Sequence, residues 1–296
     1  MKHSKHQLSY RINVLLKLNA LLFSAKSFLF LVLHLFILAI LNCSSPVFAS
    51  STTSSNSHNE HKMSSRLSSF LDAHDSMTPE MKEIAIQKII DFNEDFKISP
   101  TNESKTLRRL FFAVQETFLK EYSLYSSFFQ TIDSGKYDCL TGSILYAVLL
   151  EEIKQKGNFD YTYQLVQTPT HVFIKIKLSD ENEMIFESTS LDNGFIATPK
   201  GINFYLNQQA KKAKEETQNG SIVLLDNQSL NNLVTLETAS ALLYFNQGVL
   251  FFNQRKFGKS LDMAKKALFF DKRDAFYDLA SISSQELRKN NLITEK

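Results

Sequence analysis

The chain has 296 residues, of which 43% are hydrophobic and 22% are charged, so it can bury the core of one or two domains. Its formal charge of +2 comes from the N-terminus, because five basic residues and no acidic ones precede Ala49. Without that segment, 28 basic residues stand against 31 acidic ones, a net charge of about −3. This balance argues against nucleic acid as a partner.

The first 49 residues have the features of a secretory signal. Residues 28–41, FLFLVLHLFILAIL, are short for a membrane span and follow a basic segment. Residues 47–49 fit the pattern that signal peptidase cleaves, which predicts cleavage after Ala49 and export to the periplasm or the medium. Two alternatives place the chain at a membrane: an uncleaved anchor at residues 28–41, or lipid attachment at Cys43.

Composition divides the rest of the chain into three parts. Residues 50–77 are rich in Ser, Thr, Asn and His, which predicts a flexible linker in which histidines such as His74 are solvated rather than metal ligands. Residues 78–200 are expected to form the main folded domain, and residues 201–296 a helical extension. Within the extension, residues 241–272 resemble one tetratricopeptide repeat, or else form two ordinary antiparallel helices. The resemblance rests on large and small packing residues at the spacing of such a repeat: Tyr244, Gly248, Phe251, Phe257, Ser260, Ala264 and Ala267.

The folded domain is expected to begin with two helices. Thr78 followed by Pro79 is a typical helix start, and the residues after it repeat apolar side chains at helical spacing. The second helix is expected after Asn102 or Ser104, with an apolar stripe that extends as far as Tyr125.

A third helix, from about Cys139 to Lys156 with Gly157 as its C-cap, is apolar on more than one face and is therefore expected to be enclosed by the fold. Strands are expected at residues 159–166, 171–178 and 184–188. This order predicts an α+β fold, in which the buried helix packs on a small antiparallel sheet, with flanking helices and a C-terminal helical extension.

Cys139 stands where a loop becomes the buried helix, in SGKYDCLTGSILYAVLLEEIKQKG. After cleavage at Ala49 it is the remaining cysteine, so it cannot form an intramolecular disulfide. The amide groups and dipole of a helix N-terminus stabilise a thiolate. His171 is the only histidine after His74, and an imidazole can hold a thiolate as an ion pair and later protonate a leaving group. The alternative is an inert buried cysteine.

A carboxylate that orients the imidazole is expected at Glu187. His171 and Glu187 are sixteen residues apart and symmetric about Ser179, so a hairpin bent there would set them face to face. The polar turn, SDENE, is centred a residue or two later, an offset that a bulge or an uneven loop would absorb. Asp192 is the alternative acid if Glu187 points away.

A Cys that opens a helix, a His that opens a strand (THVFIKIKL) and an acid that ends the next strand (MIFESTS) resemble the transglutaminase-like superfamily of papain-type cysteine enzymes, over residues 134–190. The resemblance implies a triad of Cys139, His171 and Glu187, with Glu where the family has Asp. It implies acyl transfer from an amide or peptide through a thioester that water or an amine resolves. The substrate is then a protein or peptide, and no cofactor or metal is implied.

The developing oxyanion needs hydrogen-bond donors, for which the backbone N–H of Cys139 and, as a second candidate, the side chain of Gln130 are available. Asp138 is expected to be a helix cap. Two other classes of protein stay open. One is an inactive binding module whose C-terminal helices dock a protein partner in the envelope. The other is a metal site of Cys139, His171 and Glu187, which lacks an evident fourth ligand.

Overall fold

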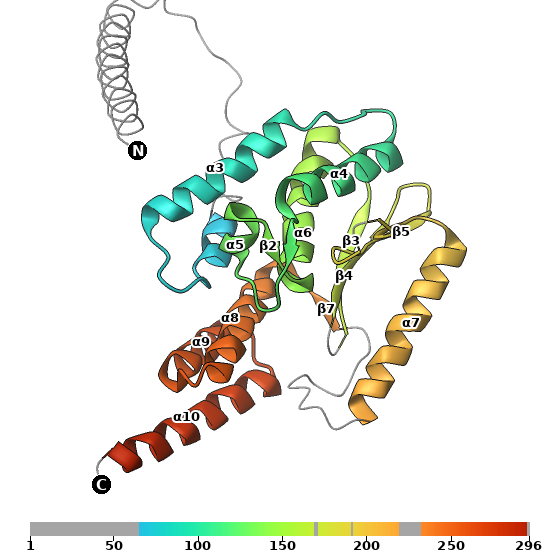
Figure 1. Ribbon diagram of the computed structural model, residues 1–296. Helices are drawn as coiled ribbons and strands as arrows, with labels where there is room; N and C mark the ends of the chain where they lie inside the picture. The colour runs from blue at the N-terminus through green and yellow to red at the C-terminus, as the bar shows by residue number, and fades with distance from the viewer. Residues whose placement is uncertain (1–64, 169–170, 191, 219–231, 295–296) are drawn as a thin grey trace, which may run out of the picture. The chain divides into compact units, whose positions relative to one another are not determined.

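A computed structural model describes residues 65–168, 171–190, 192–218 and 232–294. Within these ranges the fold is mixed α+β, mostly helical with a small antiparallel sheet, as the sequence predicted (Figure 1). No helix in these ranges is both long enough and apolar enough to cross a membrane. The predicted signal at residues 1–49 and the lipid attachment considered for Cys43 lie outside the described residues.

The centre of the fold is α6 (Cys139–Gly157), which packs on one face of the sheet. The sheet has the order β6-β5-β4-β3-β7, with every neighbouring pair antiparallel. Its strands are β3 (Thr162–Gln167), β4 (Val172–Lys177), β5 (Glu183–Phe186), β6 (Phe195–Ile196) and β7 (Asn232–Val234). Residues on all sides of α6, such as Ile144, Leu145 and Leu149, are fully buried, which confirms the enclosed helix.

The start of α6 is fixed by a capping box. The Asp138 carboxylate accepts the backbone N–H of Thr141 at 2.8 Å, and the Thr141 hydroxyl oxygen accepts the backbone N–H of Asp138 at 3.0 Å. The predicted cap is therefore confirmed, and Cys139 is the first residue inside the helix.

The end of α6 lies one residue later than predicted. Asn158, not Gly157, adopts the left-handed conformation, with φ of 49°. Gly157 is still helical, and its lack of a side chain makes room for the ring of Phe159. A Cβ at position 157 would lie 2.2 Å from that ring.

Three helices lie between residue 78 and α6: α3 (Pro79–Asp95), α4 (Glu103–Phe118) and α5 (Phe128–Asp133). Thr78 and Asn102 cap α3 and α4 through side-chain hydrogen bonds, as expected. The predicted extension of the α4 stripe to Tyr125 is wrong, because α4 ends at Phe118. The backbone N–H groups of residues 120 and 121 both donate to the Gly135 carbonyl instead.

This contact pairs two short strands, β1 (Glu121–Tyr122) and β2 (Lys136–Tyr137), in parallel. The pairing draws the segment after α4 alongside the residues that lead into Cys139. Tyr122 and Tyr137 pack edge to face, with ring centroids 5.9 Å apart.

Part of the predicted linker is folded. Residues 65–71 are helical, and Leu67, Phe70 and Leu71 at helical spacing are fully buried in the core. His74 is not a solvated linker residue, because it is half-buried and its Nδ1 lies 2.8 Å from the Ser127 hydroxyl oxygen. The polar composition of residues 50–77 concealed this apolar stripe.

The second face of the sheet is covered by α7 (Pro199–Gln218), on the side away from α6 (Figure 1). A small cluster of Val166, Phe173, Ile185 and Ile202 is buried between them. Residues beyond 200 therefore help to build the sheet and its cover, since they supply both α7 and β7.

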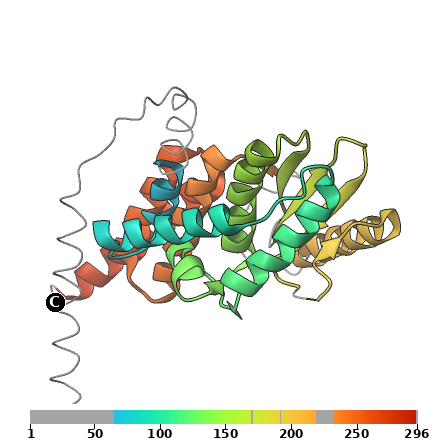
Figure 2. The same cartoon turned by 90° about the horizontal axis from the view of Figure 1, so that it is seen from above.

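The predicted C-terminal hairpin consists of α8 (Leu236–Asn253) and α9 (Phe257–Phe270), followed by α10 (Asp274–Thr294). These helices lie on the other side of α6 from α7 (Figure 2), and α8 packs directly on α6. One continuous apolar core extends from residues 65–71 to α10.

Gly142 allows α6 to approach the end of β5 closely. A Cβ at this position would lie 2.9 Å from the Ser188 Cβ and 3.0 Å from its hydroxyl oxygen. We expect Gly142→Ala to lower the free energy of unfolding by roughly 1 kcal/mol or more, because overpacking outweighs the better helix propensity of Ala.

The matched control is Gly258→Ala in α9, where nothing lies within 4 Å of the added Cβ. It should be neutral or stabilising, by at most about 1 kcal/mol. Urea unfolding of both variants measures the difference, and equal stabilities would contradict the close approach at Gly142.

Candidate active site

The β4–β5 hairpin sets His171 and Glu187 on the same face of the sheet. The last pair of β4 and β5 is Ile174 with Phe186, so the next pair along would be Phe173 with Glu187. His171, two residues before Phe173, is then a diagonal neighbour of Glu187 on the same face. The expected symmetry about Ser179 is wrong by one residue, because the pairs centre on residue 180. A diagonal contact, rather than a bulge, accommodates the offset.

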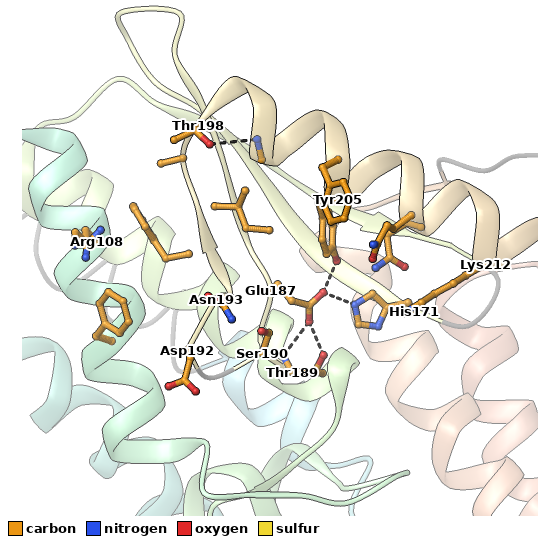
Figure 3. Close-up of a pocket in the computed structure, with 18 residues that line it drawn as sticks. Arg108, His171, Glu187, Thr189, Ser190, Asp192, Asn193, Thr198, Tyr205 and Lys212 are labelled. Atoms are coloured by element: carbon orange, nitrogen blue, oxygen red, sulfur yellow. Dashed lines mark hydrogen bonds and ion pairs between the residues drawn. The ribbon is translucent and has the colours of Figure 1, made fainter.

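The Glu187 carboxylate is buried and held by four hydrogen bonds (Figure 3). Its Oε2 lies 2.5 Å from His171 Nε2 and accepts a hydrogen bond from the Tyr205 hydroxyl. Its Oε1 accepts the backbone N–H of Thr189 at 2.9 Å and the Thr189 hydroxyl at 2.6 Å. With both oxygens engaged, the carboxylate cannot rotate, and it therefore fixes the orientation of the imidazole.

Cys139 is the second neighbour that acts on the same imidazole, since hydrogen bonding and charge from its side chain help to raise the pKa of His171. Nε2 lies 2.5 Å from Glu187, so Nδ1 is the ring nitrogen available to the sulfur. Cys139 is half-buried rather than sealed, so a substrate can reach it. The fold thus brings together Cys139, His171 and Glu187 from one helix and two strand ends.

These neighbours decide the protonation state of His171. Burial opposes the imidazolium, but the hydrogen bonds and charges of Cys139 and Glu187 outweigh it and raise the pKa of His171 to about 10. Burial also opposes the Glu187 anion, yet hydrogen bonds from His171, Thr189 and Tyr205 lower the pKa of this carboxyl. At neutral pH a cationic imidazole therefore has two partners, the anionic carboxylate of Glu187 and the side chain of Cys139.

The Asp138 carboxylate, next to Cys139 in sequence, is buried and accepts the backbone N–H of Thr141 at 2.8 Å and the Thr141 hydroxyl at 3.1 Å. Burial raises the pKa of Asp138 to about 6 in spite of these hydrogen bonds. Asp138 takes the N–H of Thr141, whereas the N–H of Cys139, the first residue of α6, has no acceptor within the helix.

Three residues that support the site were not predicted from the sequence. Tyr205 comes from α7, and nothing local in the sequence indicates its contact with Glu187. Thr189 does have a local signal, since hydroxyl residues often hydrogen-bond to a neighbour two positions away. The third is Tyr122 in β1. Burial and then the charges of Cys139 and Asp138 raise the pKa of Tyr122 to about 12, so its hydroxyl remains a donor at neutral pH.

Gln130, the second oxyanion candidate, has a structural task in α5. Its Oε1 accepts the backbone N–H of Ser127 at 2.9 Å, which completes a capping box. Among the described residues, Gln130 makes no hydrogen bond to the three site residues. Asp192, the alternative acid, lies near Glu187 but does not replace it, since Glu187 itself holds His171.

A groove of about 890 Å³ begins at His171 and Glu187. It runs between α7, β6 and α4, and we call it the α4–α7 groove. Figure 3 shows Arg108 of α4 at the end away from His171 and Lys212. Cys139 is not one of the lining residues and adjoins the groove through His171.

Comparison of the chain with protein-family models gives no match, and comparison with curated proteins gives none either. The part of the chain that the structure describes contains no group of three or more His, Cys, Asp or Glu side chains arranged to hold a metal ion.

The raised pKa of His171 makes a pH-dependent contribution to stability. A folded-state pKa above the ordinary 6.5 means that the folded protein holds the proton more tightly. This contribution is complete below about pH 6.5 and is lost as the pH rises through about 10. We expect the stability advantage of the wild type over His171→Gln to shrink between pH 8.5 and 9.5, above the ordinary pKa of a thiol, by up to about 1.4 kcal/mol per pH unit.

The control is His74→Gln. Burial lowers the pKa of His74, so its contribution is lost on acidification and should not change between pH 7 and 9.5. Urea unfolding across this pH range measures both differences. A constant advantage of the wild type over His171→Gln would contradict the raised pKa.

Proposed function

We propose that the chain is a transglutaminase-like cysteine enzyme, which transfers an acyl group from an amide or peptide through a thioester on Cys139. The observation that carries the proposal is one imidazole, that of His171, shared between the Cys139 side chain and a carboxylate that is itself fixed by Thr189 and Tyr205. A cysteine that only fills space in the core does not require an imidazole oriented by a carboxylate beside it.

In the first half of the reaction, the Cys139 thiolate, paired with the His171 imidazolium, attacks the carbonyl carbon, and the C=O electron pair moves to the oxygen. The tetrahedral intermediate then collapses, the C–N bond breaks, and the leaving nitrogen takes the proton of the His171 imidazolium. The products are a thioester on Cys139, a free amine and a neutral imidazole.

In the second half, neutral His171 takes a proton from water or from an amine as that molecule attacks the thioester carbon. The C–S bond breaks, and the thiolate–imidazolium pair is restored. Water gives net hydrolysis of the amide, whereas an amine gives net exchange of one amine for another. Glu187 keeps Nδ1 of His171 directed at the sulfur in both halves.

The oxyanion of the intermediate is assigned to the open end of α6. The Cys139 N–H is the donor nearest the attacked carbon, and the helix dipole favours negative charge at this position. The N–H of Thr141 is held by Asp138, which keeps the start of α6 in place.

We also infer that the enzyme acts after export, with residues 1–49 removed. The support is the basic segment, the short apolar run at residues 28–41 and the cleavage pattern before Ser50. Detection of the mature N-terminus at Ser50 by mass spectrometry would support this, whereas an intact residue 1 on the exported or membrane-bound chain would contradict it.

A second candidate function is a binding module without turnover, favoured by exposed aromatic side chains on the C-terminal helices. Phe269 in α9 is 82% exposed, and Tyr277 in α10 is 52% exposed. Cellular function that survives Cys139→Ala but not Phe269→Ala would favour this candidate, and the reverse would favour the enzyme.

Alkylation of Cys139 tests the proposed nucleophile. An ordinary thiol is only about 1% ionised at pH 6.5, whereas an ion-paired one reacts as a thiolate. We expect iodoacetamide at pH 6.5 to modify the folded protein at least about fivefold faster than the urea-unfolded chain. His171→Gln and Glu187→Gln should remove this advantage.

Asp192→Asn is the matched control, because it removes a carboxylate from the same groove that does not bind His171. It should leave the alkylation rate within about twofold of the wild type. The proposal fails if folded and unfolded chains react equally at pH 6.5 and His171→Gln has no effect.

A further inference from the structure

The α4–α7 groove leads directly to the proposed catalytic imidazole and has the size of a ligand site. Its walls combine apolar and polar side chains. Phe112, Phe195 and Phe204 supply aromatic surface, and Phe204 is 65% exposed although it is a large hydrophobic residue. Such exposed rings beside a catalytic group are suited to contact an apolar side chain of a substrate.

The far end of the groove is formed by Arg108. Its guanidinium lies 5.3 Å from the ring centroids of both Phe112 and Phe195, which hold it in place. Among the described residues, no carboxylate forms an ion pair with Arg108. A guanidinium oriented by two rings offers its donors to a carboxylate from outside the chain.

Positive charge continues beyond Arg108. A second hollow of about 640 Å³ shares Arg108 and Phe112 with the groove. It is lined by the cations Lys97, Lys105 and Arg109 and by the anions Asp95 and Glu116. With Arg108 included, cations outnumber anions by four to two in this hollow, so the surface favours an acidic ligand.

Inside the α4–α7 groove, too, cations outnumber anions. The Glu187 carboxylate is compensated by the imidazolium of His171. Asp192 is the remaining anion, and Figure 3 shows its carboxylate pointing away from Glu187 and Asn193. Arg108 and Lys212 are the remaining cations of the groove.

We propose that the α4–α7 groove binds the acyl-donor peptide, and that it selects a segment with an aromatic or large apolar side chain and a carboxylate. The aromatic walls take the apolar side chain, and Arg108 takes the carboxylate at the end away from His171. This inference rests on the proposed acyl-transfer function, because it assigns the substrate class of that site.

The experiment measures binding separately from turnover, in the full chain carrying Cys139→Ala. Four probes are titrated by ligand-observed NMR. N-acetyl-Phe-Glu-amide is compared with N-acetyl-Phe-Gln-amide, to test a side-chain carboxylate. N-acetyl-Gly-Phe is compared with N-acetyl-Gly-Phe-amide, to test a C-terminal carboxylate. We expect the acid to bind at least about fivefold more tightly than its amide in one pair or both.

Arg108→Gln should abolish the preference for the acid. Its control is Arg288→Gln, which removes the same charge from an exposed position on α10 and should keep the preference. Phe204→Ala should weaken acid and amide alike by several-fold, whereas Ile84→Ala, at an exposed apolar side chain of α3, should weaken neither.

Equal binding of acid and amide in both pairs, or a preference that survives Arg108→Gln, would overturn the assignment of the groove. Failure of the enzyme is distinguishable from this result. The amide probes are therefore also incubated with the wild-type chain, in which Cys139 is present. If the acid preference and its loss in Arg108→Gln are found but wild-type Cys139 forms no acyl adduct with any amide probe, the groove assignment stands and the acyl-transfer proposal fails.

Discussion

The site depends on one interaction, the contact of the His171 imidazole with the fixed carboxylate of Glu187 at 2.5 Å. A buried histidine would ordinarily lose its proton, because burial disfavours the cation. Here Glu187 and the Cys139 side chain reverse that preference. Most of the unusual local structure serves to keep these three side chains in place.

Glu187 can act in this way because it has no freedom of its own. Thr189, two residues further on, holds one carboxylate oxygen, and Tyr205 holds the other together with His171. Tyr205 is in turn packed edge-on against Phe173 of β4, with ring centroids 5.1 Å apart. The helix that covers the sheet is thus also the helix that fixes the acid.

The C-terminal helices support the cysteine from the opposite side. Asn246 of α8 contacts the Asp138 carboxylate at 3.5 Å, and the neighbouring Gln247 donates to the Tyr125 carbonyl at 2.9 Å. The first contact falls on the cap that sets Cys139 at the start of α6, and the second holds the segment between β1 and α5. The chain beyond residue 200 therefore contributes to both sides of the site and is more than an appendage to it.

What the sequence predicted correctly depends on short-range patterns. Asp138 and the apolar run after it determine where α6 begins, and both are local. The face shared by His171 and Glu187 follows from the two-residue period of strands. Both features could therefore be found without the fold.

What the sequence did not predict depends on contacts between distant segments. The end of α4 is set by a carbonyl at Gly135, and the hydroxyl that fixes Glu187 comes from Tyr205. The buried stripe at Leu67, Phe70 and Leu71 was hidden because the residues around it are polar. Only the packed chain reveals where these residues lie.

The most direct test of the central claim is the protonation state of His171 itself, read from the imidazole nitrogen shifts of ¹⁵N-histidine-labelled protein at pH 8. The account predicts an imidazolium at His171 in the wild type and a neutral ring in Glu187→Gln combined with Cys139→Ala, since the partners that raise its pKa to about 10 are then gone. A neutral His171 in the wild type at pH 8 would contradict it.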